Sequence, residues 1–334
     1  MSGLYPIKFK PIFKERVWGG AKLKALYNKA VPEGLTIGES WELSGIQGDI
    51  SIATNGYLEG NSLEELIEVY MGDLVGDRVF EIFGNEFPLL IKLIDAEMDL
   101  SIQVHPDNKL ALERHGAYGK TEMWYVLDSQ AAAKIFCGFK SDIEKDAYSS
   151  AVTDDSIGSL INTHNAAAGD TFFIPPGRVH SIGAGNVLAE IQQCSDITYR
   201  IYDWNRKGLN GKARELHTEL ALDAIDYKGS NDKLKKSDAP TNSAFKLAGC
   251  EFFTVNMIKL DIETERDYIS LDSFVVYLCI SGSVKIEWDQ GEETIVKGET
   301  ILMPASLDRA VLKGKAEILE IYIDEDEKQH TNEN

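Results

Sequence analysis

Two short stretches of the chain follow the same pattern, and this repeat constrains the fold more than any other feature. Gly169–Pro175 reads GDTFFIP and Gly298–Pro304 reads GETILMP, and the two align without a gap. Each begins with a glycine and an acidic residue, which are typical of a turn, and ends with a proline after a short apolar run. The repeat therefore predicts a turn and then a buried strand at two separate points of the chain.

Strand-like sequence surrounds both copies of the repeat. The first block contains five short runs, at 123–127, 133–136, 170–174, 187–192 and 198–202, and the second block covers 244–324. Many short strands separated by turns are typical of small antiparallel barrels of the cupin and jelly-roll kind. We therefore predict a mainly β fold with two cupin-like/jelly-roll antiparallel β-barrel domains and a few helices in the N-terminal half.

The expected helices and the linker set the domain boundaries. Ser62 fits an N-cap, and Glu65 completes a capping box for a helical stretch at 62–82. Residues 229–243 are polar and rich in turn formers, which is typical of an interdomain linker. We predict a catalytic cupin-like domain with helical additions at 1–235 and a C-terminal cupin-like β domain at 240–325.

The charge balance of the chain argues against several kinds of partner. The 334 residues carry a formal net charge of −20, whereas nucleic acids and anionic membranes attract clustered Lys and Arg. We therefore expect no nucleic acid and no membrane as partners, while a small phosphorylated substrate is compatible with the composition. No apolar stretch reaches about 18 residues, and the N-terminal residues do not resemble a signal peptide. The four cysteines form no CxxC pair, so a reduced, cytoplasmic setting is expected.

Two alternating strands carry side chains that bind metals. Ser101, Gln103 and His105 alternate with apolar residues and share one face of a predicted strand. Lys120 and Glu122 share one face of a second strand. Because cupin-like barrels bring residues from separate strands to a common interior, these two faces are expected to converge.

A later turn supplies a second histidine. His180 ends PPGRVH at 175–180, and with Gln103, His105 and Glu122 it forms a mixed nitrogen and oxygen set that suits zinc. This set predicts one Zn2+ per chain. The second copy of the repeat is followed by Arg309 where the first is followed by His180, so we expect the C-terminal domain to be without metal.

One arginine and two lysines are expected to act on a substrate. Asp196 and Arg200 share a strand face. One interpretation is that the Arg200 guanidinium stabilises an oxyanion beside the metal. The alternative is that it forms an ion pair with an aspartate and so holds the strand in place. Lys92 and Lys120 are candidate phosphate-binding or proton-transferring cations, and a nearby metal is expected to lower the pKa of Lys120.

Four motifs together resemble the type I mannose-6-phosphate isomerases, also called phosphomannose isomerases. They are PLLIKLIDAEMDLSIQVHP at 88–106, KTEMWY at 120–125, PPGRVH at 175–180 and YRIYDW at 199–204. The resemblance covers residues 5 to about 325. Only about 58 residues separate Glu122 from His180, so the chain resembles the short bacterial form, which lacks an inserted helical domain.

The resemblance implies an activity and a set of site residues. The family consists of zinc-dependent aldose–ketose isomerases of cupin fold, which interconvert D-mannose 6-phosphate and D-fructose 6-phosphate through an enediol(ate) in mannose metabolism. By resemblance, the zinc ligands are Gln103, His105, Glu122 and His180, the catalytic residues are Arg200, Lys120 and Asp196, and the substrate-binding residues are Lys92 and Ser101. The expected partner is a sugar phosphate, and the expected assembly is a monomer or weak homodimer.

Several alternatives remain open at the level of sequence. Lys120 and Asp196 are both candidates for the base that moves the proton, and the phosphate-binding residues are not assigned. Two histidines and a carboxylate also suit the iron of an oxygenase. A non-catalytic sugar-phosphate sensor is the other alternative, and turnover distinguishes it from an enzyme.

Overall fold

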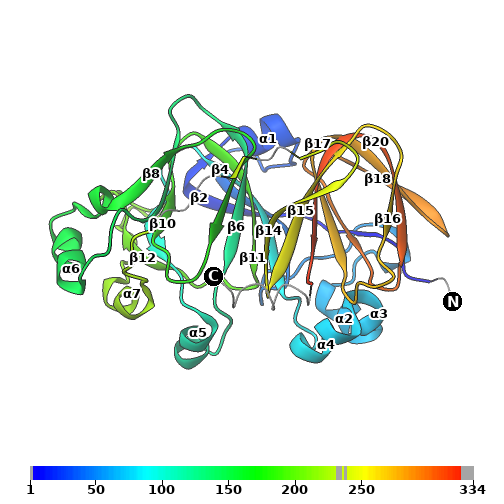
Figure 1. Cartoon of the computed structure of the whole chain (residues 1–334), viewed down its shortest axis with the longest axis horizontal. Coiled ribbons are helices and arrows are strands. Elements are labelled where there is room, and N and C mark those ends of the chain that lie inside the picture. Colours follow the sequence, from blue (N-terminus) through cyan, green and yellow to red (C-terminus); the bar gives the residue numbers. More distant parts are fainter. Residues whose placement is uncertain (1–2, 231–234, 237–238, 325–334) are drawn as a thin grey trace. The chain divides into compact units, whose positions relative to one another are not determined.

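The computed structural model of the chain describes residues 3–230, 235–236 and 239–324 (Figure 1). The chain divides into two compact units. We call the unit formed by 13–41 and 91–236 the central unit, and the unit formed by 1–12, 42–90 and 237–334 the C-terminal unit. Both are mainly β, as the sequence predicts.

This division differs from the expected domains in two segments. The compact units break near residue 236, and 1–12 and 42–90 group with the C-terminal block and not with the rest of 1–235. The domain bounds expected from the sequence stay a prediction. Backbone pairing explains part of this grouping, because Ile7 pairs with Leu302 in an antiparallel ladder. Residue 325 and residues 231–234 and 237–238 of the predicted linker lie outside the described residues.

The C-terminal unit contains one eight-stranded antiparallel sheet. Its main path runs β1-β19-β17-β20-β15-β14, with β16 paired to β20 and β18 paired to β17. The strands are β1 (Ile7–Lys8), β14 (Ala244–Cys250), β15 (Phe253–Leu260), β16 (Thr264–Asp267), β17 (Val275–Trp288), β18 (Gly291–Val296), β19 (Thr300–Met303) and β20 (Arg309–Tyr322). Apolar side chains from five of these strands, among them Ile258, Tyr277, Ile295, Ile301 and Leu312, form one buried core.

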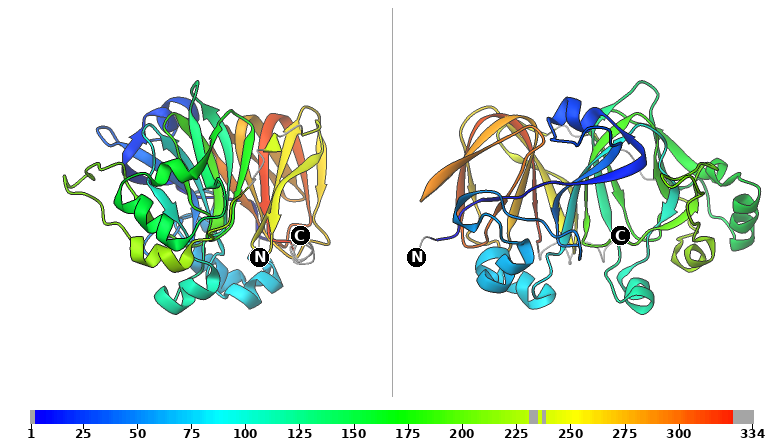
Figure 2. Two further views of the ribbon diagram at one scale, coloured as in Figure 1. Left: turned by 60° about the vertical axis from the view of Figure 1, so that its left-hand side comes forward. Right: turned by 180° about the vertical axis from the view of Figure 1, so that it is seen from behind.

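The helices of the C-terminal unit begin as predicted but are interrupted twice. They are η1 (Gly56–Leu58), α2 (Leu63–Tyr70), α3 (Gly72–Val75) and α4 (Asp77–Phe83), of which α2–α4 cluster at one end of the strands (Figures 1 and 2). Ser62 caps α2 and forms the expected capping box with Glu65. Positive φ angles at Met71 and Gly76 divide the predicted stretch 62–82 into three helices.

The central unit is built from two sheets. One sheet has seven strands. In sheet order they are β13 (Lys235–Lys236), β9 (Asp170–Ile174), β6 (Glu122–Ser129), β11 (Asn186–Gln193), β4 (Leu89–Ala96), β2 (Ile12–Gly20) and β3 (Ile37–Ser44). The other sheet has five strands. In sheet order they are β12 (Tyr199–Tyr202), β5 (Ile102–Val104), β10 (His180–Ile182), β7 (Lys134–Phe139) and β8 (Ile161–Asn165). The five strand-like runs predicted in this block correspond to β6, β7, β9, β11 and β12.

Two hydrophobic cores lie on either side of the five-stranded sheet. One core joins its residues, such as Ile135 and Ile182, to Trp124 and Leu188 of the seven-stranded sheet. The other joins it to helices, for example through Tyr148 of α6. The helices of this unit are α1 (Lys22–Tyr27), α5 (Asn108–His115), α6 (Lys145–Thr153), η2 (Ile157–Leu160) and α7 (Thr218–Ala224). The central unit therefore has sheet, sheet and helix layers.

The prediction of antiparallel barrels needs a correction. Within the described residues, the outermost strands of each sheet do not pair with each other, so no sheet closes into a barrel. In the central unit the apolar faces are instead buried between two separate sheets, as in a jelly-roll sandwich. In the C-terminal unit, Gly282 and Gly314 have positive φ angles inside the long strands β17 and β20, and such irregularities bend a sheet around its core without closing it.

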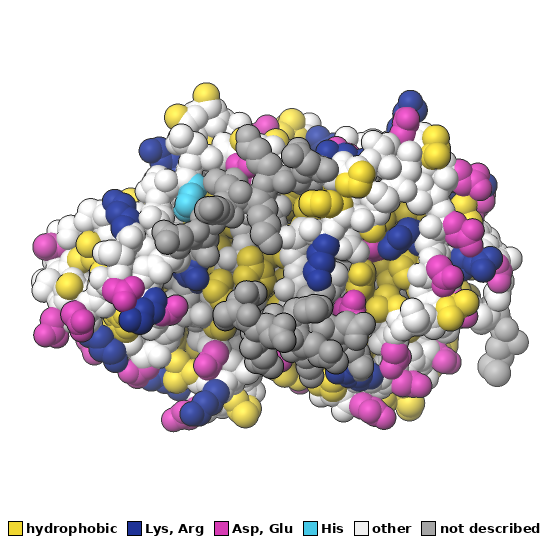
Figure 3. All heavy atoms as spheres, viewed as in Figure 1, with side chains coloured by type: hydrophobic (Ala, Val, Ile, Leu, Met, Phe, Trp, Pro, Cys, Tyr) yellow, Lys and Arg dark blue, Asp and Glu magenta, His cyan; other side chains and the backbone are white. Residues whose placement is uncertain are grey.

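The outer surface mixes both signs of charge. On the face drawn in Figure 3, acidic side chains are spread over the surface with basic side chains among them. Searching the described residues for a helix long and apolar enough to cross a bilayer gives no candidate.

Candidate active site

A cavity of about 560 Å³ opens between the two sheets of the central unit. The five-stranded sheet contributes Gln103 and Arg200, and the seven-stranded sheet contributes Glu122, Lys92 and Glu190. Polar side chains on strands are rarely buried without partners, so their convergence in one cavity indicates a functional site.

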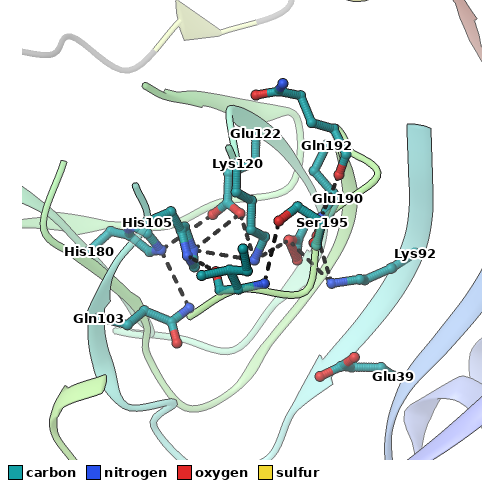
Figure 4. Close-up of polar contacts among 12 residues, drawn as sticks. Glu39, Lys92, Gln103, His105, Lys120, Glu122, His180, Glu190, Gln192 and Ser195 are labelled. Atoms are coloured by element: carbon teal, nitrogen blue, oxygen red, sulfur yellow. Dashed lines mark hydrogen bonds and ion pairs between the residues drawn. The ribbon is translucent and has the colours of Figure 1, made fainter. Parts of the chain in front are cut away.

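Two histidines and one carboxylate meet at the buried end of this cavity (Figure 4). In the described part of the chain, His105, Glu122 and His180 are the group whose donor atoms all lie within 4.8 Å of one another. Glu122 Oε2 is 3.5 Å from His105 Nε2, and Glu122 Oε1 is 3.3 Å from His180 Nε2. All three residues are at most 1 % exposed.

Backbone carbonyls fix the tautomers of both histidines. His105 Nδ1 lies 2.9 Å from the carbonyl oxygen of Ile197, and His180 Nδ1 lies 2.8 Å from that of Arg178. Since a carbonyl only accepts, each Nδ1 carries the proton and each Nε2 directs a lone pair at Glu122. Burial lowers the pKa of His105 well below its usual value and lowers the pKa of His180 to about 3, so both rings are neutral.

This donor set fits a divalent ion. Ligand atoms about 2.1 Å from a tetrahedral zinc lie about 3.4 Å apart. Each histidine Nε2 lies close to that spacing from one oxygen of Glu122, and one donor atom from each of the three residues lies within 4.8 Å of the others. Glu122 Oε2 is buried without a well-oriented hydrogen bond, as expected for an oxygen that serves as a metal ligand.

Gln103 lies beside this group because β5 and β10 are neighbours. His180 pairs directly with Gln103 in the ladder, and Gln103 Nε2 is 3.4 Å from His180 Nε2. Gln103 Oε1, the amide atom that can bind zinc, instead accepts a hydrogen bond from Ser101 Oγ at 3.3 Å. A rotation of the terminal amide exchanges these two positions, so Gln103 is adjacent to the three other donors but oriented away from them.

Lys120 places a buried ammonium against the same donors. Its Nζ lies 3.1 Å from Glu122 Oε2 and 3.2 Å from His105 Nε2. Burial alone lowers the pKa of Lys120, but the carboxylates of Glu122 and Glu190 outweigh it, so the net pKa is raised. The lowered pKa expected from the sequence depends on a bound metal ion, so it stays a prediction.

A carboxylate that the sequence analysis did not identify sits between the two lysines. Glu190 Oε1 lies 3.6 Å from Lys92 Nζ and 3.7 Å from Lys120 Nζ. Burial raises the pKa of Glu190 to about 7, although Lys92 and Lys120 act against this shift. Lys92 also donates to Gln192 Oε1 at 2.7 Å. Glu190 is therefore a carboxyl group inside the cavity that titrates near neutral pH.

A second unpredicted carboxylate lies further along the cavity wall. Glu39 accepts hydrogen bonds from Arg16 Nε at 2.8 Å and from Trp41 Nε1 at 2.7 Å. Burial alone raises the pKa of Glu39, but the charges of Lys92 and Arg16 outweigh it and lower the pKa to about 2. Glu39 therefore stays ionised at neutral pH, unlike Glu190.

The sequence contains a signal for Glu190 and for its neighbour Gln192. Glu190 and Gln192 pair with Trp124 and Glu122 in the ladder, so they lie on the cavity side of β11. The run VLAEIQQ at 187–193 shows them as polar residues within an otherwise buried strand. Polar residues at alternate positions of such a run indicate a strand that faces a polar interior.

Arg200 occupies the edge strand of the five-stranded sheet and lines the cavity. Its Nη1 donates to the carbonyl oxygen of Glu215 at 2.8 Å, and no carboxylate of the described residues forms an ion pair with it. Asp203 instead pairs with Arg206 and Arg214. Burial and the charge of Arg214 lower the pKa of Arg200. The alternative of an ion pair that holds the strand is therefore not observed.

The remaining predicted residues also reach the cavity. Ser101 is buried and Asp196 is exposed, and both line it. Of the nine predicted site residues, seven line the cavity of the central unit, and His105 and His180 lie within 3.5 Å of one of them, Glu122. The structure adds Glu190 and Glu39 to the lining.

The chain matches known families over most of its length. Residues 7–140 match the catalytic domain of type I phosphomannose isomerase, and residues 243–323 match the mannose-6-phosphate isomerase cupin domain. The chain is 33% identical over 320 residues to the mannose-6-phosphate isomerase ManA of Bacillus subtilis, covering 94% of this chain and 98% of that protein.

The chain belongs to the type I phosphomannose isomerase family.

Further comparisons agree with this membership. The mannose-6-phosphate isomerase of Streptococcus mutans is 30% identical over 332 residues, covering 96% of this chain and 99% of that protein. The crystal structure of the Bacillus subtilis mannose 6-phosphate isomerase has a TM-score of 0.87 with 30% identity, covering 96% of this chain and 100% of that chain. The family and the enzyme class expected from the sequence, an isomerase classed as an intramolecular oxidoreductase, are thereby confirmed.

Proposed function

We propose that the protein interconverts D-mannose 6-phosphate and D-fructose 6-phosphate, with one Zn2+ held by His105, Glu122, His180 and Gln103. The observation that supports this most directly is the convergence of two neutral Nε2 atoms on one buried carboxylate inside a cavity. Its relatives carry the name mannose-6-phosphate isomerase, which supports the choice of substrate. Gln103 joins the ligands once its amide has rotated.

The chemistry requires a proton to move between carbons 1 and 2 of the open-chain sugar while negative charge develops on their oxygens. Zinc, when bound, supplies a Lewis acid that polarises these oxygens. Arg200 extends a permanent positive charge into the cavity and balances the developing enediolate. Lys120, held as an ammonium by two carboxylates, adds a second cation from the segment just before β6.

Glu190 is the residue that we propose to carry the proton. A general base works best when its pKa lies near the working pH, and the pKa of Glu190 is about 7. Lys120 is less suited, because its raised pKa keeps it protonated. Asp196 remains the other candidate, since it lines the same cavity. Lys92 and Ser101 are proposed to bind the substrate.

A coupled assay tests this function. The wild-type protein is expected to form fructose 6-phosphate from mannose 6-phosphate, and to do so without oxygen, which separates an isomerase from an oxygenase. Unphosphorylated mannose serves as the control substrate and is expected to react poorly. Binding of fructose 6-phosphate without conversion in either direction would instead identify a sensor and overturn the proposal.

Other expectations from the sequence remain proposals of the same kind. We propose a cytoplasmic location, in agreement with four cysteines that are all free thiols. We also propose that the C-terminal cupin-like domain holds no metal and that the protein is a monomer or weak homodimer. Arg309, which was expected to replace a ligand there, is 57 % exposed and pairs with Glu265 at 2.9 Å.

A further inference from the structure

Residues 215–217 follow the edge strand β12 in the chain and form three hydrogen bonds with Arg200. Arg200 N donates to His217 Nδ1 at 3.1 Å, and His217 N donates to the Arg200 carbonyl at 2.7 Å. Arg200 Nη1 donates to the Glu215 carbonyl at 2.8 Å. Two of these three contacts use the backbone of the segment, so only the first depends on the identity of a side chain.

The position of Arg200 in the sheet explains why it needs this support. β12 is an edge strand, with β5 as its neighbour on one side. The backbone N–H and C=O of Arg200 both bond to His217, so they point to the side where a further strand is missing. The imidazole Nδ1 therefore takes the place of a strand carbonyl, which otherwise satisfies such a donor.

The side chain of His217 does not cap helix α7, although the residue stands at its N-cap. It occupies the N-cap of α7, where Ser, Thr, Asp and Asn usually accept a hydrogen bond from the first turn. His217 makes no side-chain cap bond, while its carbonyl accepts from Ala221 N at 2.9 Å. The helix thus anchors the residue, and the ring is free to accept from Arg200.

The chemistry of the ring suits an acceptor. Burial and the charge of Arg200 lower the pKa of His217, against an opposing effect of Glu215, so the ring is neutral at neutral pH and Nδ1 keeps its lone pair. The Tyr199 ring lies 6.4 Å away, centroid to centroid, at a tilt of 45°. His217 is half-buried, and removal of its ring leaves the Arg200 N–H without this acceptor.

Few contacts other than these define the direction of the Arg200 side chain. Its Nε is buried without an acceptor, and Nη1 has the Glu215 carbonyl as its one hydrogen-bond partner among the described residues. A shift of β12 against the segment 215–217 therefore moves the guanidinium directly relative to the cavity.

We propose that His217 is a positioning residue, which holds the backbone of Arg200 through Nδ1 and so aims the guanidinium at the reacting oxygens. This inference rests on the proposed isomerase function and extends it to a residue outside the cavity wall. His217 itself touches neither substrate nor metal.

Two substitutions separate positioning from folding. His217→Leu removes the acceptor and is expected to lower kcat roughly tenfold, the effect of one neutral hydrogen bond, with KM changed less than about twofold. His217→Asn keeps an acceptor oxygen at the same distance from the main chain and is expected to recover most of kcat. His164→Leu is the matched control, because His164 is also half-buried in the central unit but pairs with β7 away from the cavity. Equal loss of kcat in the Leu and Asn variants would overturn the proposal.

A double substitution tests whether the effect passes through Arg200. In an Arg200→Ala background, His217→Leu is expected to cause no further loss of kcat. A further tenfold loss there would show that His217 acts by another route and would overturn the proposal.

Amide hydrogen exchange gives a readout that does not depend on turnover. The Arg200 amide is expected to exchange slowly in the wild type and in His217→Asn, and faster in His217→Leu. An unchanged exchange rate in His217→Leu would overturn the proposal even if kcat fell. A wild-type protein that exchanges as expected but has no isomerase activity would instead count against the proposed function.

Discussion

Lys120 Nζ lies 3.1 Å from Glu122 Oε2, so a buried ammonium and a proposed metal ligand share one oxygen. Lys120 lies two residues before Glu122, the first residue of β6, and both side chains line the cavity. The cation lowers the affinity of Glu122 for a divalent ion, because like charges repel across a short distance. It also leaves Lys120 next to the oxygens of a bound sugar. We therefore interpret Lys120 as an electrostatic partner of the metal site.

His180→Ala is predicted to release the metal. The side chain is fully buried and supplies one of few donors, and its removal leaves a site that exchanges its ion readily. Elemental analysis after dialysis should find well below one zinc per chain in this variant. His164→Ala, a substitution of a histidine with no contact to the donors, should retain the metal. Full zinc occupancy in His180→Ala would remove the residue from the ligand set.

Glu190→Gln is predicted to abolish the acidic limb of the pH–rate profile. The ionised carboxylate is the proposed base, so kcat should rise as pH rises through the pKa of Glu190, which is about 7 without metal. A bound cation favours the carboxylate and shifts this limb to lower pH. The Gln variant should be slow at every pH. Glu39→Gln is the comparison variant: it should keep the limb but move it to lower pH, because the charge of Glu39 helps to raise the pKa of Glu190. An unchanged limb in Glu190→Gln would assign the base elsewhere, with Asp196 as the next candidate.

The raised pKa of Glu190 also predicts how the stability of the metal-free protein depends on pH. The folded state raises the pKa of Glu190 above its usual value, so the folded protein binds this proton more tightly than the unfolded chain. The stability that this group contributes is present at acidic pH and is lost as pH rises through about 7. The unfolding free energy of the metal-free wild type should therefore fall relative to that of Glu190→Gln between pH 5 and 8, measured by urea denaturation. A difference that stays constant with pH would contradict the shift.

Part of the site could be read from the sequence because strand alternation places side chains reliably. Gln103, Glu122 and Arg200 were assigned to strand faces, and each lines the cavity. Glu190 was missed because the run 187–192 was predicted only as a strand, and its polar positions were not assigned to a face. The division of helix 62–82 could not be predicted at Met71, since a positive φ is unusual for a methionine.

The order in which the strands pair also could not be predicted from local sequence patterns. Nothing in the sequence near Ile7 indicates that it pairs with Leu302, because pairing between distant strands leaves no periodic trace. Two separate sheets and a closed barrel likewise share the same alternation of apolar residues, so the pattern predicted the strands but not whether they close.

Arg200→Ala is predicted to keep the metal and lose most of the turnover. The guanidinium donates to a backbone carbonyl and forms no ion pair in the described part of the chain, so its loss should disturb the fold little. Removing a preorganised charge that acts on the transition state costs on the order of 100- to 1000-fold in kcat. KM should change much less, and Arg200→Lys should recover only part of the rate because it lacks the planar fork. Kinetics, zinc content and circular dichroism should be measured on the same preparations. Loss of zinc in Arg200→Ala would indicate a structural role.

The zinc titration of the metal-free wild type tests the central claim most directly. Protein stripped with a chelator is titrated with zinc while the conversion of mannose 6-phosphate to fructose 6-phosphate is followed. The account predicts negligible turnover without metal, a linear recovery as zinc is added, and a plateau at one zinc per chain. Full turnover in protein that elemental analysis shows to be free of metal would contradict it.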